Sequence, residues 1–174
     1  EGRMVPQVVH EETIDRYFDK ICGWMSDAQR ADMKKKFSHA DQLNQTQQRI
    51  YAIAWDISQH FRENWQGSKF KAQLVAPRKR IAILYKQYLD EIGIVSSEVL
   101  ITSPDTREGE DEAFGDTSNV EVAFWKRMMD EYGTAKKYEA SIINRFKNSD
   151  KPEIIIVVDK LLTGFDEPRN TVLY

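Results

Sequence analysis

The stretch IIIVVDKLLTGFDEP, residues 154–168, decides the fold expected for this chain. Residues 154–158 are all β-branched, which favours a strand with both faces covered. Such a strand lies near the centre of a parallel sheet that has helices on its faces. The more polar residues 159–168 are expected to form a loop at the carboxyl end of this strand. The stretch therefore predicts an α/β protein with residues 154–158 in the middle of the sheet.

The segments on both sides alternate between strand and helix patterns. Short apolar runs predict strands, and apolar residues at helical spacing predict amphipathic helices, one of them ended by Gly93. Residues 103–118 are rich in Ser, Pro, Gly, Asp and Glu and predict an exposed loop. The further expected elements are strands at 72–76, 99–101 and 171–174 and helices at 81–92, 120–132 and 135–147. This order is typical of a parallel sheet flanked by helices.

The first third of the chain has only helical patterns. Apolar stripes run from Ile14 to Met25 and from Ile50 to Phe61, and a short helix is expected between them at 26–37. We therefore divide the chain into a helical segment, residues 1–66, and an α/β lobe, residues 67–174. Because the sequence stops within an apolar strand, we interpret it as a piece of a longer protein.

Composition restricts the class of protein further. The chain has 174 residues, of which 41% are hydrophobic and 30% charged, and its net charge is −3. No apolar run reaches the ~20 residues that cross a bilayer, and the single cysteine, Cys22, fits a reducing compartment. We therefore expect a cytoplasmic protein. The acidic balance disfavours a small stand-alone DNA-binding domain, and the three scattered histidines disfavour a metal site.

Two loops carry candidate chemistry. Three cations, Arg78 to Arg80, stand at a helix start, where the helix dipole opposes positive charge and a nearby phosphate would offset the cost. In the second loop, Thr163 offers a hydroxyl, Gly164 an unobstructed amide and Asp166 a carboxylate. From the residues alone, a solvated basic patch and an ordinary turn explain the same two patterns, and both alternatives stay open.

The second loop also carries a resemblance. The run VVDKLLTGFDEPRNTVLY at 157–174 resembles helicase motif V of the R subunits of type I restriction enzymes, and LVAP at 74–77 with the cations after it is similar to motif IV. The two motifs frame about 100 residues in the family's order. The resemblance implies a RecA-like fold, incomplete here, from the second lobe of a superfamily 2 motor that moves double-stranded DNA. It also implies ATP and Mg²⁺, bound mainly by a first lobe outside this sequence.

Carried over by position, the resemblance places Thr163 and Gly164 at the DNA backbone and Asp166 on the nucleotide side of the cleft between lobes. Arg78 and Lys79 would contact the DNA backbone from motif IV, although many relatives have Arg at the position of Lys79. The implied partners are the first lobe and nuclease domain of the same chain, and the methylation and specificity subunits. The sequence contains no G-x-x-x-x-G-K-[ST] phosphate loop and no Q-x-x-G-R-x-x-R arginine-finger element. This fragment alone is therefore expected to be inactive.

Two other classes of function fit parts of the sequence. Asp159, at the end of the buried strand, is typical of the phospho-acceptor of a receiver domain, but the acidic pair and the later lysine of that class are not visible. A non-catalytic α/β interaction domain, in which residues 159–168 only form a turn, also stays open for the isolated fragment.

Overall fold

In a computed structural model of the chain, the structure describes residues 45–104 and 117–174. These residues form four helices and four strands. In chain order they are α3 (Gln45–Asn64), β1 (Lys71–Val75), α4 (Lys79–Ile92), β2 (Ser97–Leu100), α5 (Thr117–Tyr132), α6 (Ala135–Asn148), β3 (Ile154–Val157) and β4 (Asn170–Leu173).

The strands form one parallel sheet in the order β2-β3-β1-β4. β3 pairs with β2 on one side and with β1 on the other. Ile154 of β3 lies beside Ser97 of β2 and beside Ala72 of β1. All four residues of β3 are 0% exposed. The expected α/β fold with β3 inside a parallel sheet is therefore confirmed, because a run of β-branched residues fits only where both sheet faces are covered.

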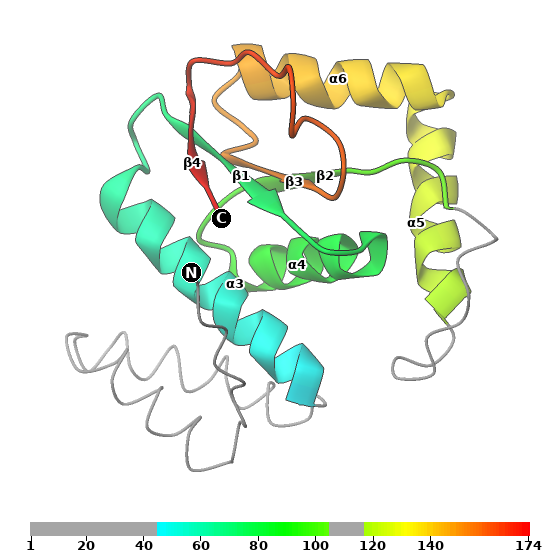
Figure 1. Cartoon of the computed structure of the whole chain (residues 1–174), viewed down its shortest axis with the longest axis horizontal. Helices are drawn as coiled ribbons and strands as arrows, with labels where there is room; N and C mark the ends of the chain where they lie inside the picture. The colour runs from blue at the N-terminus through cyan, green and yellow to red at the C-terminus, as the bar shows by residue number, and fades with distance from the viewer. Residues whose placement is uncertain (1–44, 105–116) are drawn as a thin grey trace, which may run out of the picture. The chain divides into compact units, whose positions relative to one another are not determined.

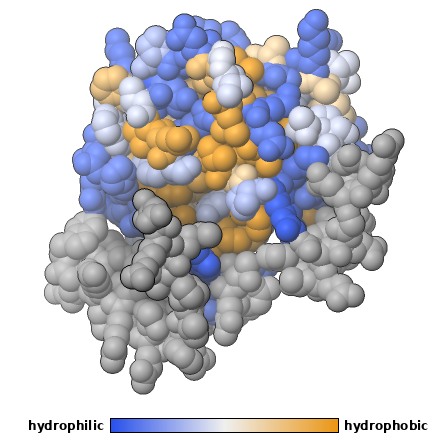
Figure 2. All heavy atoms as spheres, viewed as in Figure 1, coloured by the Kyte–Doolittle hydropathy of each residue, from blue (hydrophilic) through white to orange (hydrophobic). Residues whose placement is uncertain are grey.

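Helices cover both faces of this sheet. α6 lies on one face, α3 and α4 lie on the other, and α5 contacts both α4 and α6 (Figure 1). The Tyr51 ring of α3 meets the Tyr88 ring of α4 edge-on, with centroids 5.1 Å apart. The buried residues of α4 recur at helical spacing, as the sequence predicts. On the face seen in this view, apolar residues form a patch in the middle, with hydrophilic residues above and beside it (Figure 2).

Local signals fix the helix ends. Gly93 ends α4 in the left-handed conformation, with φ 69°, and its amide donates to the Leu89 carbonyl at 3.0 Å. The Thr134 side chain begins α6 by accepting a hydrogen bond of 3.2 Å from the Lys137 amide. The turn between α5 and α6 uses Gly133, at φ 80°. These residue types permit the turns at those positions, so the helix limits follow from the sequence.

The expected element bounds agree with the structure within a few residues at each end. α3 confirms the helix expected at 50–61, and the compact unit that contains the sheet begins at Gln45. The two helices expected at 14–37 lie outside the described residues, and so does most of the loop expected at 103–118. The division at residues 66 and 67 stays a prediction.

Candidate nucleic-acid interface

The loop between β3 and β4, residues 158–169, carries the candidate motif V residues. We call this segment the β3–β4 loop. It leaves the carboxyl end of the inner strand β3, where ligand sites of parallel sheets are commonly found. It then runs to the C-terminal part of α6, where the Phe165 ring packs on the Phe146 ring and the Lys147 ammonium bonds the Asp166 carbonyl (Figure 1). The Gln73 side-chain amide in β1 reaches the Leu161 carbonyl at 3.4 Å. The exposed side chain of Asp159 marks the point where the loop leaves the sheet.

Thr163 and Gly164 are open to solvent. Both are exposed, and within the described part of the chain the Thr163 hydroxyl makes no hydrogen bond. Gly164 has φ 71°, and a Cβ placed on it would meet no atom within 4 Å. Leu161 also has a positive φ, 61°, which L residues other than Asn and Asp rarely adopt. The loop therefore holds a strained turn that presents a hydroxyl and a bare glycine amide outward.

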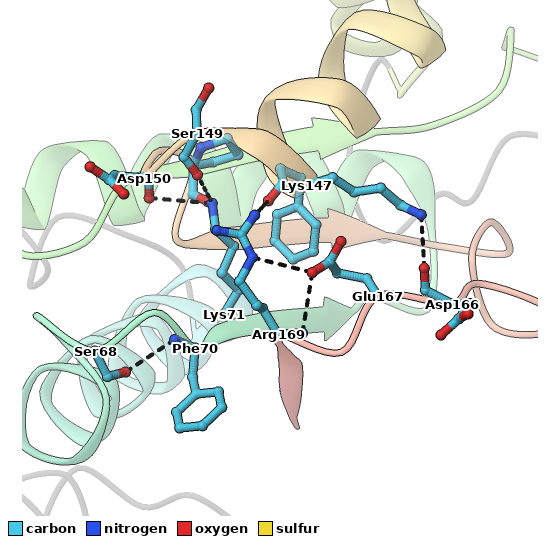
Figure 3. Close-up of polar contacts among 11 residues, drawn as sticks. Ser68, Phe70, Lys71, Lys147, Ser149, Asp150, Asp166, Glu167 and Arg169 are labelled. Atoms are coloured by element: carbon cyan, nitrogen blue, oxygen red, sulfur yellow. Dashed lines mark hydrogen bonds and ion pairs between the residues drawn. The ribbon is translucent and has the colours of Figure 1, made fainter.

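Asp166 faces solvent from the same loop. Its backbone carbonyl accepts a hydrogen bond of 2.8 Å from the Lys147 ammonium near the end of α6. Its exposed carboxylate points away from that contact (Figure 3). The carboxylate is therefore available to a partner molecule, whereas the main chain at this residue is tied to α6.

Aromatic and basic side chains connect the loop to α6 and β1. The Phe165 ring packs on the Phe146 ring of α6, with centroids 6.2 Å apart, and the Lys147 ammonium lies 5.0 Å from the centre of the Phe165 ring. The Lys71 ammonium, at the start of β1, lies 5.2 Å from the centre of the same Phe146 ring. Phe146 is fully buried, so it gives the loop a rigid floor.

Lys71 itself is a buried cation. Only 2% of it is exposed, and its ammonium donates to the carbonyls of Ser149, Asp150 and Pro152 at 2.6, 3.3 and 2.8 Å (Figure 3). Burial lowers the pKa of Lys71, and the positive charge of Arg169 lowers it further. These carbonyls belong to the turn between α6 and β3, so Lys71 fixes that turn to the start of β1.

The motif IV cations lie in different environments. Arg78 is exposed. It lies immediately before α4, at the N-cap position, and its backbone is extended. Lys79 is only 9% exposed, and its ammonium donates to the Ser103 carbonyl at 3.0 Å. The Arg80 amide donates to the Glu121 carboxylate of α5 at 2.9 Å. A carboxylate at the first turn of α4 offsets part of the unfavourable charge there, so an external phosphate is not the only compensation.

The candidate DNA-contacting residues lie in two different parts of the lobe. Arg78 follows β1 and Asp159 follows β3, and the two strands pair side by side, so both residues lie at the carboxyl edge of the sheet. Thr163 to Asp166 lie farther back over the α6 face. Only 9% of Lys79 is exposed, so a direct phosphate contact requires its ammonium to become more accessible, and the role predicted for Lys79 stays a prediction.

The residues that hold the loop were not predicted from the sequence. Gln73 is 4% exposed and accepts a hydrogen bond of 2.9 Å from the Asn170 side chain, which ties β1 to the start of β4. A polar residue inside an apolar strand was the available signal. Lys147 gave no comparable signal, because a lysine in the last turn of a helix is ordinary.

Two further features concern other classes of site. Residues 45–104 and 117–174 contain no group of three or more His, Cys, Asp or Glu side chains that could hold a metal ion. In the same residues, no helix combines the length and the apolar character needed to cross a membrane.

The sheet, its helices and the open loop define a RecA-like α/β lobe. Residues 60–174, more than half of the chain, match the family model described as type I restriction enzyme subunit R domain 3. The chain belongs to this family. The expected resemblance to R subunits is thereby confirmed.

Curated relatives agree with this result. The chain is 28% identical over 185 residues to the type I restriction enzyme MjaVIIIP endonuclease subunit of Methanocaldococcus jannaschii, covering 95% of this chain and 17% of that protein. It is 28% identical over 177 residues to the MjaVIIP endonuclease subunit of the same organism, covering 94% of this chain and 16% of that protein. The chain thus spans about a sixth of these relatives. No solved structure matches it significantly.

Proposed function

We propose that this chain is part of the ATP-dependent, DNA-translocating motor of a type I restriction enzyme. In this proposal Thr163, Gly164 and Arg78 contact the backbone of double-stranded DNA, and Asp166 faces the nucleotide cleft between this lobe and a first lobe. ATP and Mg²⁺ are bound mainly by that first lobe. The full-length subunit works in the cytoplasm with its nuclease domain and with the methylation and specificity subunits.

One observation supports this proposal most strongly. Thr163 and Gly164 are exposed and the Thr163 hydroxyl makes no hydrogen bond to a described residue, yet the loop that carries them rests on the buried ring of Phe146. An open donor pair on a rigid support suits contacts to phosphate oxygens, which position a protein on DNA without reading sequence.

The site also explains why the fragment alone is proposed to be inactive. The sequence lacks a phosphate loop and an arginine-finger element, so nucleotide hydrolysis requires groups from elsewhere in the subunit. A lobe of net charge −3 with few backbone contacts is expected to bind DNA weakly and in a salt-sensitive manner by itself.

The test uses the full-length subunit assembled with its partner subunits. In this proposal Thr163→Ala removes a hydrogen bond from the Thr163 side chain to the DNA backbone. The DNA concentration that gives half-maximal ATPase activity should therefore rise by about three- to tenfold, the range for one lost hydrogen bond. Asp166→Ala should lower the maximal ATPase rate instead, because Asp166 is placed at the nucleotide. Steady-state ATPase assays over a range of DNA concentrations measure both quantities.

Ser149→Ala provides a matched control. Ser149 is also an exposed hydroxyl residue, but it lies in the turn between α6 and β3, at the opposite end of β3 from the loop's departure. Its substitution should leave both ATPase quantities unchanged. Normal ATPase activity in both Thr163→Ala and Asp166→Ala would contradict the proposal and favour a non-catalytic interaction domain.

A further inference from the structure

Lys147 makes the hydrogen bond that joins the exposed part of the β3–β4 loop to the rest of the lobe. The Lys147 ammonium donates to the Asp166 carbonyl at 2.8 Å. Among the described residues, this is the only hydrogen bond that involves residues 162–166. The same ammonium lies 5.0 Å from the centre of the Phe165 ring. One side chain therefore restrains both the main chain and the aromatic anchor of this segment.

The later part of the loop is held by a separate set of contacts. Arg169 pairs with the Glu167 carboxylate at 3.2 Å and donates to the Phe146 carbonyl at 3.1 Å (Figure 3). The Asn170 amide donates to the Glu167 carbonyl at 2.9 Å. Because these bonds do not involve Lys147, removing the Lys147 ammonium takes away the hydrogen bond to residues 162–166. The packing of Phe165 on Phe146 and the loop's return to β4 stay in place.

Lys147 is well placed to hold the loop without being part of the core. Its side chain is half-buried, and it lies in the last turn of α6, where the helix dipole stabilises a cation. The Phe146 ring beside it is fixed by burial and by the contact with Phe165. The helix thus sets the position of Lys147, and Lys147 in turn helps to hold residues 162–166.

We infer that Lys147 is a positioning residue, which orients Thr163 and Gly164 for DNA without contacting DNA itself. This inference rests on the proposed function. A mobile segment must be ordered when it binds, and the free-energy cost of ordering weakens binding. Holding the segment in advance through Asp166 and Phe165 removes part of that cost.

The test compares Lys147→Met with Lys147→Arg in the full-length subunit assembled with its partners. Methionine keeps an apolar stem and removes the donor, so the DNA concentration for half-maximal ATPase should rise by about three- to tenfold, with the maximal rate little changed. Arginine keeps a cationic donor and should stay within about twofold of the unmodified subunit. Lys136→Met, which removes an exposed lysine from the first turn of α6, should have no effect.

Two readouts separate positioning from direct contact. A lysine that binds a phosphate contributes about 0.9 to the slope of log affinity against log salt concentration, so a positioning residue leaves this slope unchanged when it is replaced. If Lys147 acts through the loop, Thr163→Ala combined with Lys147→Met should weaken DNA activation less than the sum of the two single effects. A lower slope in Lys147→Met, additive effects, or unchanged DNA activation would each overturn the inference.

The outcome for Thr163→Ala distinguishes the proposed function of the loop from the positioning role of Lys147. If Thr163→Ala leaves DNA activation unchanged, the proposed function of the loop fails, whatever Lys147→Met does. If Thr163→Ala weakens activation and Lys147→Met does not, only the positioning role of Lys147 fails.

Discussion

Gly164→Ala tests the openness of the β3–β4 loop, and Gly133→Ala is its matched control. The two glycines have φ values of 71° and 80°, and a Cβ on either would meet no atom within 4 Å. The folded protein therefore has room for both methyl groups, and the cost of each substitution comes from the left-handed backbone alone. That cost is about 1–2 kcal/mol for an L residue, so urea unfolding of the 174-residue chain should show similar losses of stability for both variants.

The two variants should differ in activity. A glycine amide that a DNA phosphate approaches closely leaves no space for a methyl group between them. Gly164→Ala in the full-length subunit should therefore raise the DNA concentration for half-maximal ATPase by about tenfold or more, the effect of losing at least ~1.4 kcal/mol of binding. Gly133→Ala, in the turn between α5 and α6, should not change it. Equal DNA activation in the two variants would refute a close approach of DNA to Gly164.

Two further predictions concern the fold. Ile156 of β3 is 0% exposed, so Ile156→Ala should lower the free energy of unfolding of the 174-residue chain by about 3–4 kcal/mol. Val122 is 48% exposed, so Val122→Ala should change that free energy by less than ~0.5 kcal/mol. Similar losses in both variants would contradict the central position of β3. Burial, and then the nearby Glu91 carboxylate, raise the pKa of Tyr51 from 10.0 to about 12. Because the folded state favours the protonated phenol, its contribution to stability is present below pH 10 and is lost as the pH rises from about 10 to about 12. Tyr51→Phe should therefore lose less stability over that pH interval in urea unfolding, and identical pH profiles would show that Tyr51 is not the group responsible.

The helices and strands of the fold could be predicted from the sequence because the patterns that indicate them are local. The β-branched run 154–158 predicted an inner strand, and β3 is one. Gly93 predicted the end of a helix, and it adopts the left-handed conformation that this role requires. The strand order β2-β3-β1-β4 was not predicted, because it depends on which strands meet after the helices have packed.

The candidate site was predictable only in part, for the same reason. Thr163 and Gly164 were expected to be open groups, and the structure leaves both exposed. The surroundings of Lys79 were not predictable, since its ammonium finds the Ser103 carbonyl, 24 residues away in the chain. The hold of Lys147 on the loop depends on α6 lying beneath it, which local patterns do not reveal.

The anchoring of the β3–β4 loop has a consequence for how the protein is made. Gln73 contacts Leu161 and Asn170, which follow it in the chain by 88 and 97 residues. During synthesis β1 leaves the ribosome long before its partners exist, and closing such long separations is slow. The loop can take its final shape only when nearly all of this sequence has emerged, so α3 and α4, which contact each other, can pack before the β3–β4 loop is held in place.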